Sequence, residues 1–202
     1  MPVHELFPEP VYFSRLERVL TKKELRTINK YKEKAYKNHG NLTSLDKYVL
    51  ENKALENLKK DLNKEVINYF NEVVCTSNSI IPYITQSWIN HTEVNQFHHL
   101  HSHGNSYVSG VFYIAANQEV DTIRFDKRSS SEIILEVLKY NIFNSNGWIR
   151  PVQTGDVLLF PSSLLHQVEP KKGMNTRISL SFNVFIKGKI GNNKGLTELV
   201  LA

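Results

Sequence analysis

The chain after Asn78 is a series of short segments rich in β-branched, aromatic and aliphatic residues, with turn-forming residues between them. Each segment has about the length of one strand, and such a series is typical of a β-sandwich or jelly roll. The segments predict strands at 83–90, 94–102, 107–116, 121–126, 148–152, 156–161, 165–169 and 177–187.

Helices are predicted before this series. Thr21 and Glu24 form a T-x-x-E capping motif, which predicts a polar, exposed helix over about 22–37. Over about 44–74 apolar residues recur at spacings of three and four, which predicts an amphipathic helix with one apolar stripe. Helices first and sheet second indicate an α+β fold in which the N-terminal helices pack on one sheet.

The length of 202 residues predicts one domain over 1–202. Its expected parts are a helical layer over about 15–76, a β core over about 80–188 and a short tail over 189–202. Residues 128–147 form a long insertion between two strands, with a helix expected over 132–138. A loop of this length is often a lid, and the sequence leaves open whether this one is.

The composition of the chain limits the binding partners and the cellular compartment that can be expected. The net charge is +5 and the 25 basic residues are spread thinly, so a nucleic-acid partner is not indicated. The N-terminus lacks the pattern of a signal peptide, and no apolar run approaches the roughly 18 residues of a membrane span. A single cysteine, Cys75, excludes an intramolecular disulfide and fits the cytoplasm. The oligomeric state stays open, with a homodimer among the assemblies allowed.

Five of the eight histidines fall within residues 91–103. Side chains alternate between the two faces of a strand, which predicts that His99, His101 and His103 share one face while His98 lies on the other. Two imidazoles at positions i and i+2 can converge on one metal, and imidazole suits zinc, copper, iron and nickel. The alternative is a set of surface histidines on an edge strand.

A third ligand is expected from His166. It follows Gly155-Asp156, an apolar strand and Pro161, which together read as a turn, a buried strand and its end. We therefore predict that His101, His103 and His166 bind one metal, whose identity this pattern leaves open.

The last predicted strand has two different faces. Its apolar face should lie under the helices, and its polar face should point into the sandwich. A guanidinium is expensive to bury there unless an anion meets it, and a carboxylate bound by the arginine fork is the simplest such anion. The alternative is an internal salt bridge to Asp or Glu. The apolar residues are Ile178, Leu180, Phe182 and Val184, and the polar ones are Arg177, Ser179, Ser181 and Asn183.

Tyr113 lies on a predicted neighbouring strand, where its hydroxyl can reach the same anion as Arg177. The alternative is a core tyrosine without a binding role.

Taken in order, these motifs resemble the 2-oxoglutarate/Fe(II) oxygenases of phage and bacteria, a family similar in its core to prolyl 4-hydroxylases. The resemblance runs from about residue 6 to residue 185. It implies a double-stranded β-helix (a jelly-roll, cupin-like core) and the use of Fe(II), 2-oxoglutarate and O2. It also makes His101 and His166 iron ligands, with Arg177 binding the distal carboxylate of 2-oxoglutarate and Tyr113 assisting. The motifs are H-x-H at 101–103, SGVFYI at 109–114, GDVLLFP at 155–161, His166, and RISLSFN at 177–183.

One position departs from the family pattern. The wider superfamily usually reads H-x-D, and this chain has His103 where the aspartate would stand. Three neutral imidazoles leave the metal its full positive charge, which favours a dianionic co-substrate. If His103 does not bind, Asp126 is the nearest downstream carboxylate.

Two other functions fit the same residues. One is a cupin-like metalloenzyme that does not use 2-oxoglutarate, and the other is a β-sandwich binding module without catalysis. The predicted oxygenase would hydroxylate a small molecule or a peptide and release succinate and CO2, and the sequence does not identify that substrate. As a soluble enzyme it is expected in the cytoplasm, that of the host cell if a phage encodes it.

Overall fold

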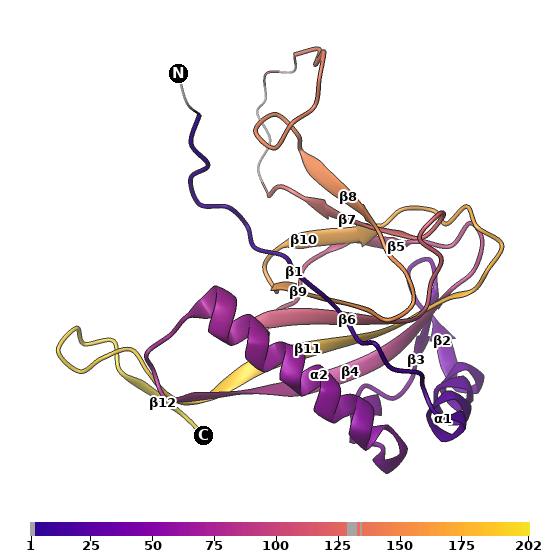
Figure 1. The fold of residues 1–202 in the computed structure, drawn as a ribbon, viewed down its shortest axis with the longest axis horizontal. Coiled ribbons are helices and arrows are strands. Elements are labelled where there is room, and N and C mark those ends of the chain that lie inside the picture. The colour runs from indigo at the N-terminus through magenta and orange to yellow at the C-terminus, as the bar shows by residue number, and fades with distance from the viewer. Residues whose placement is uncertain (1–2, 129–132, 134) are drawn as a thin grey trace.

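The structure is a computed structural model that describes residues 3–128, 133 and 135–202. Over these residues the fold is mixed α/β and dominated by sheet, with two α-helices, an eight-stranded sheet and a four-stranded sheet (Figure 1). The helices are α1 (Lys22–Glu33) and α2 (Glu56–Tyr69), with two short 3-10 helices, η1 (Val49–Glu51) and η2 (Lys53–Leu55), before α2 and a π-helical turn, η3 (Phe70–Val74), after it.

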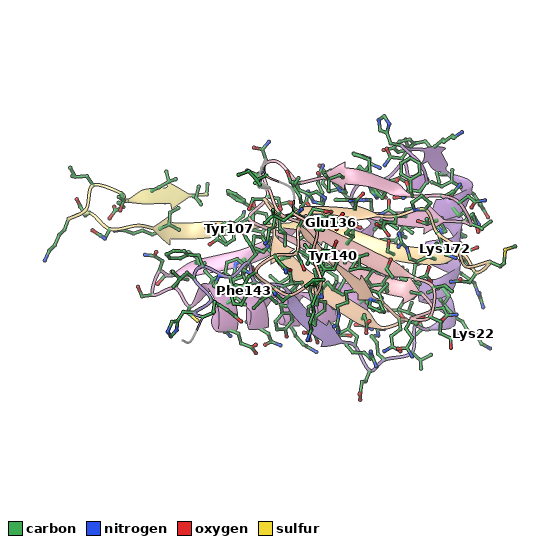
Figure 2. All side chains as sticks on the ribbon, turned by 90° about the horizontal axis from the view of Figure 1, so that it is seen from above. Lys22, Tyr107, Glu136, Tyr140, Phe143 and Lys172 are labelled. Atoms are coloured by element: carbon green, nitrogen blue, oxygen red, sulfur yellow. The ribbon has the colours of Figure 1, made fainter. Side chains whose placement is uncertain are left out.

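The larger sheet is antiparallel, and β11 lies at its centre between β6 and β4. The short strand β12 pairs with the far end of β11, and Figure 2 shows this hairpin projecting from the body of the molecule. The strands, in spatial order, are β1 (Tyr12–Arg15), β9 (Asp156–Pro161), β6 (Val108–Ala115), β11 (Arg177–Ile190), β4 (Ile80–Thr92), β3 (Leu42–Ser44) and β2 (Ala35–Lys37), with β12 at Leu199–Leu201.

The smaller sheet is also antiparallel and lies over one face of the larger sheet (Figure 1). Its strands, in spatial order, are β5 (His98–His101), β10 (Leu165–Val168), β7 (Thr122–Asp126) and β8 (Gly147–Pro151).

Two hydrophobic cores hold the layers together. The first lies between the helices and the larger sheet, where Leu58 and Leu62 of α2 pack with Leu180 and Phe182 of β11. The second lies between the two sheets and includes Phe125 of β7. The N-terminal helices therefore pack on one face of the larger sheet, as predicted, and the other face is covered by the smaller sheet.

Side chains of β11 alternate between the two faces of the larger sheet, so one set points toward the helices and the other toward the smaller sheet. Leu180, Phe182 and Val184 are fully buried under the helices. Arg177 and Ser179 point into a pocket between the sheets. This confirms the predicted division of the strand into an apolar and a polar face.

The predicted helix over 22–37 is polar and largely exposed, as expected, but its predicted end is wrong. The capping box forms as expected, with Thr21 and Glu24 each accepting from the backbone of the other. The helix stops at Glu33, because residues 35–37 pair with β3 as strand β2. One side is buried, since Ile28 is 0% exposed and Glu24 accepts two hydrogen bonds from Arg18.

The predicted helix over 44–74 begins too early. Residues 42–44 form β3, and the Ser44 hydroxyl accepts from the Ile89 backbone N–H at 3.0 Å. Regular α-helix starts at Glu56, after Asn52 has capped a 3-10 turn through the Ala54 N–H. Hydrogen bonds with β4, from the Ile89 N–H to Ser44 and from the Leu50 N–H to the Ser87 hydroxyl, outweigh the local helical spacing in this segment.

Each of the eight predicted strands has a counterpart, with shifted ends. Four further strands, β1, β2, β3 and β12, were not predicted, because segments of three or four residues carry too short a pattern. The largest shift is in β5, which covers His98–His101 in place of 94–102.

The insertion between β7 and β8 lies partly outside the described residues, at 129–132 and 134. The helix predicted over 132–138 is absent from its described positions, 133 and 135–138. Figures 1 and 2 place Glu136, Tyr140 and Phe143 on the side of the molecule that carries the smaller sheet. Whether it acts as a lid stays open.

No helix in the described ranges has the length and apolar character needed to cross a bilayer.

Gly110 and Phe182 are in close contact, so a substitution at Gly110 can test the packing of the central strands. The two residues are paired across β6 and β11, and a Cβ atom added at Gly110 would overlap the Phe182 ring. We expect Gly110→Ala to lower the free energy of unfolding by about 1–3 kcal/mol, measured by urea denaturation. Adding Phe182→Leu should recover part of the loss.

Gly104→Ala is the matched control, because an added Cβ there meets nothing within 4 Å. Its free energy of unfolding should stay within about 0.5 kcal/mol of wild type. Equal effects of the two substitutions would contradict the packing described here.

Candidate active site

The pairing of β5 with β10 builds one wall of the pocket. His101 lies opposite His166, and His98 lies opposite Val168. The four residues 98–101 of β5 therefore span the three residues 166–168 of β10, so β5 carries a β-bulge. The bulge turns His98 and His101 toward the same side, and both line the pocket.

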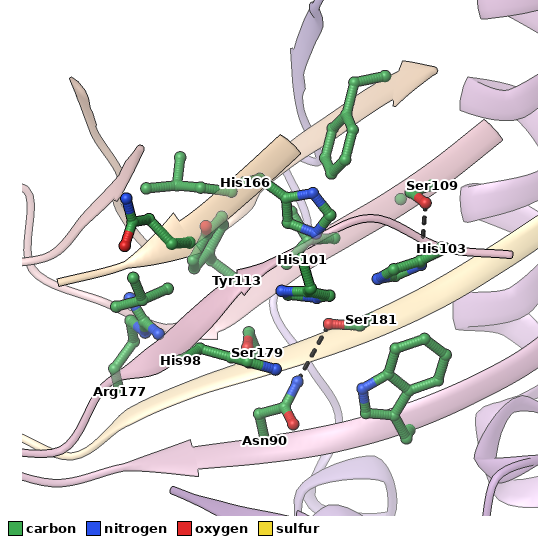
Figure 3. A pocket seen from close by; sticks show the side chains of 17 residues that line it. Asn90, His98, His101, His103, Ser109, Tyr113, His166, Arg177, Ser179 and Ser181 are labelled. Atoms are coloured by element: carbon green, nitrogen blue, oxygen red, sulfur yellow. Dashed lines mark hydrogen bonds between the residues drawn. The ribbon is translucent and has the colours of Figure 1, made fainter. Parts of the chain in front are cut away.

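Three imidazoles meet in this pocket. His101, His103 and His166 each offer a ligand atom, and these atoms lie within 4.8 Å of one another. The ring centres are 4.3 Å apart for His101 and His166, 5.2 Å for His101 and His103, and 5.1 Å for His103 and His166. Figure 3 shows the three rings turned toward one another.

Ring spacing tests whether a metal fits. A metal lies about 2.1 Å from an imidazole nitrogen and so about 3.2 Å from the ring centre, which puts two ligating rings about 4.5 Å apart at a right angle and about 5.2 Å apart at the tetrahedral angle. The three observed spacings span this range. The triad therefore fits one first-row transition metal.

The Nδ1 atom of each ring has an oxygen acceptor. His101 Nδ1 lies 2.7 Å from the carbonyl of His99, and His166 Nδ1 lies 2.9 Å from that of Leu164. His103 Nδ1 lies 2.6 Å from the side-chain oxygen of Asn183. These oxygens can only accept, so each neutral ring carries its proton on Nδ1 and leaves the Nε2 lone pair for a metal.

Burial keeps the three rings neutral. It lowers the pKa of His101 to about 4 and of His166 to about 3, helped by the electrostatic effect of the neighbouring imidazoles. It also lowers the pKa of His103, against the opposing effect of the Asn183 hydrogen bond. Neutral imidazoles are the form that binds metals.

Arg177 lies in the same pocket and is 3% exposed. Its guanidinium donates to the Thr122 carbonyl at 3.0 Å and to the Thr92 hydroxyl at 3.4 Å, and its Nε has no partner. Burial lowers its pKa, which Tyr113 and Asp121 only partly oppose.

The salt bridge considered for Arg177 in the sequence is not present. Within the described ranges no carboxylate lies within 4.0 Å of its guanidinium, and Asp121 is instead ion-paired with Lys171 at 3.7 Å. A buried cation without a paired anion is costly, so the pocket favours an anionic ligand at this point.

Tyr113 and the polar residues complete the pocket. Tyr113 is 2% exposed, and burial raises its pKa to about 12, so its hydroxyl remains a donor. On the opposite wall the Asn90 amide donates to the Ser181 hydroxyl at 3.1 Å (Figure 3). Trp88 lies beside this pair, with its ring centre 5.6 Å from that of His103.

Asp126 does not approach the three histidines. Its carboxylate accepts from Arg124 and from Gln167, both at 2.9 Å, and it is not part of the metal-binding group found among the described residues. The structure therefore does not support it as a replacement for His103.

Two residues of the site differ from the sequence prediction. His98 lines the pocket, and His99, which was predicted to share the face of His101, is exposed. The β-bulge causes this exchange, and strand alternation alone could not reveal it. Asn183 was predicted on the polar face of its strand, but its contact with His103 depends on a residue 80 positions away.

Comparison with known proteins agrees with this geometry. Residues 86–183 match the family model described as "Putative 2OG-Fe(II) oxygenase". This part of the chain is similar to that oxygenase family. The match confirms the resemblance seen in the sequence, and with it a 2-oxoglutarate-dependent oxygenase that uses Fe(II), 2-oxoglutarate and O2. No match was found among curated proteins.

Several solved structures have a fold similar to that of this chain. The epimerase SnoN from nogalamycin biosynthesis has a TM-score of 0.63 at 10% identity, covering 88% of this chain and 76% of that one. A prolyl hydroxylase from Trichoplax adhaerens, in complex with a peptide fragment, has a TM-score of 0.58 at 13% sequence identity. The match covers 87% of this chain and 83% of that one. HygX from Streptomyces hygroscopicus, with nickel, 2-oxoglutarate and hygromycin B bound, has a TM-score of 0.56 at 14% sequence identity. The match covers 85% of this chain and 82% of that one.

The contact of Asn183 with His103 predicts a loss of metal affinity. Asn183→Ala removes the acceptor that orients the ring and fixes its proton on Nδ1. We expect Fe(II) or Ni²⁺ to bind about 10–100-fold more weakly, measured by anaerobic titration. Asn90→Ala is the control, since Asn90 lines the same pocket but bonds to Ser181. If both variants bind metal alike, the Asn183 contact does not orient a ligand.

Buried neutral histidines predict acid sensitivity of the metal-free protein. Burial lowers the pKa of His98 and His166 to about 3 and of His91 and His101 to about 4, against an ordinary 6.5. The unfolded chain therefore binds more protons below about pH 6.5, and the free energy of unfolding should fall from there toward about pH 4. Urea denaturation across this range measures the fall.

His98→Asn should make this dependence on pH shallower, because one buried imidazole no longer differs between the folded and unfolded chains. An unchanged slope in the variant would show that His98 titrates normally in the folded protein.

Proposed function

We propose that this chain is a hydroxylase of the 2-oxoglutarate/Fe(II) oxygenase family, formed by one oxygenase domain over 1–202. In this proposal His101, His103 and His166 hold Fe(II), and Arg177 with Tyr113 holds 2-oxoglutarate. The observation that carries it is the position of Arg177, a buried guanidinium without a carboxylate partner in the pocket where the ligand atoms of three imidazoles converge.

The three histidines prepare the metal site before any metal arrives. Their Nδ1 protons are held by the acceptors described above, so the rings cannot turn freely and the Nε2 lone pairs stay directed at one point. Bound Fe(II) would use O2 as the oxidant and couple decarboxylation of 2-oxoglutarate to hydroxylation of a C–H bond, with one oxygen atom entering succinate, the other entering the product, and CO2 released. Three ligands leave room for other groups at the metal.

Arg177 and Tyr113 select the co-substrate. The guanidinium supplies the positive charge that a distal carboxylate needs, and the protonated hydroxyl of Tyr113 supplies a further donor. The low exposure of both residues keeps water away, which strengthens their interaction with an anion.

The architecture is proposed to be the double-stranded β-helix of this family. Its two antiparallel sheets, with an apolar core between them and the pocket on their facing surfaces, support this reading. The helices would then cover only the outer face of the larger sheet.

The substrate is proposed to be a small molecule or a peptide. The related structures support both classes, because HygX holds hygromycin B and the Trichoplax adhaerens enzyme holds a peptide fragment. The wall of Trp88, Asn90 and Ser181 offers one aromatic face and two hydrogen-bonding groups to either. We also propose a cytoplasmic location, that of the host if a phage encodes the chain, and the homodimer stays a prediction.

The proposal is tested by adding 2-oxoglutarate anaerobically to the Fe(II)-loaded protein and recording the visible charge-transfer band. We expect a band in wild type and none in His166→Ala. Arg177→Met should still bind Fe(II), but its binding of 2-oxoglutarate should be weaker by about 2–5 kcal/mol, because the distal carboxylate loses its charged partner.

Arg150→Met is the matched control, since Arg150 stacks on the Phe13 ring and does not line the pocket. Its band and its affinity for 2-oxoglutarate should equal those of wild type. A folded, iron-loaded wild type without a band would overturn the proposal. Normal 2-oxoglutarate binding by Arg177→Met would remove Arg177 from it and favour a cupin-like enzyme.

A further inference from the structure

Two histidines outside the pocket also lie close together. His39 is in the turn between β2 and β3, and His99 is in β5, and both side chains are exposed. Their ring centres are 5.3 Å apart with an angle of 72° between the ring planes. The proposed oxygenase chemistry uses neither side chain.

The fold holds this pair together through the backbone. The Phe97 N–H donates to the Gly40 carbonyl at 3.1 Å, and the Asn38 N–H donates to the Asn41 carbonyl at 2.8 Å. Gly40 has a φ of +99°, and a Cβ there would lie 2.7 Å from the Phe97 carbonyl oxygen and 2.8 Å from its ring. The turn that carries His39 is therefore fixed against the segment that leads into His99.

The spacing of the pair matches that of two imidazoles bound to one metal. Their ring centres lie at almost the separation of about 5.2 Å expected at the tetrahedral angle. It is also close to the spacings of 5.2 and 5.1 Å that His103 makes within the triad. Imidazole prefers divalent zinc, copper, nickel and iron to calcium or magnesium.

We propose that His39 and His99 form a second metal site, which binds a divalent first-row transition metal through two imidazoles, with water at the remaining positions. Exposure of both rings makes this an open site that exchanges its metal readily.

The second site is joined to the triad through the backbone of His99. The carbonyl of His99 accepts the Nδ1 proton of His101 at 2.7 Å, so one residue serves both sites. The ring of His99 is also 5.0 Å from that of His101, and the ring of His98 packs against both, at 5.2 and 4.5 Å. A metal at the second site therefore holds the segment that orients a ligand of the first.

Counting bound Ni²⁺ by calorimetric titration tests the proposal. Wild type should bind two ions per chain, and His39→Ala/His99→Ala should bind one. A variant with His101→Ala/His166→Ala should also bind one, and that ion should be lost, or held at least about 10-fold more weakly, when the His39 and His99 substitutions are added. Thermal unfolding confirms that each variant is folded.

His4→Ala is the control, because it removes another exposed histidine and should leave both ions bound. If His39→Ala/His99→Ala binds as much Ni²⁺ as wild type, the second site does not exist. This comparison decides the question even if the triad variant does not fold. Failure of the triad as a metal centre would appear separately, as no ion bound in His39→Ala/His99→Ala.

Discussion

The antiparallel pairing of β5 with β10 is the constraint on which the candidate active site depends. It sets His101 directly opposite His166, and the added residue in β5 turns His98 into the same pocket. Paired strands have fixed spacing, so two of the three proposed ligands are preorganised by backbone hydrogen bonds alone. The third, His103, follows β5 and is held by its N–H to the Ser162 carbonyl at 2.9 Å.

Strand β11 couples stability to function. Its apolar face completes the core under α2, while its other face carries Arg177 and Asn183 into the pocket. A shift of one residue in its pairing with β4 and β6 would exchange these faces, exposing Leu180 and Phe182 to the pocket. The hydrophobic effect that stabilises the sheet therefore also positions the buried guanidinium, whose desolvation the apolar face helps to offset.

A centre of three histidines changes the electrostatics of the proposed iron site. In the H-x-D pattern of the wider superfamily a carboxylate neutralises part of the metal charge, whereas His103 brings none. The compensation available is neutral, through the Asn183 oxygen and the Ser109 hydroxyl at 2.6 and 2.9 Å from His103 Nδ1. With Arg177 also unpaired, the pocket has two points that favour negative charge, which matches a dianion with a carboxylate at each end.

The sequence alone determined the strand series, the two faces of β11 and the residue types that converge, because these follow from local alternation and from the chemistry of imidazole and guanidinium. Tertiary structure decided the rest. The segment 44–55, whose spacing predicted α-helix, instead ends β3 and forms two 3-10 helices, and His98 and His99 exchanged places through a bulge. The acceptor for His103 came from a distant strand. Such outcomes depend on contacts between segments far apart in the chain, whose energies no local pattern contains.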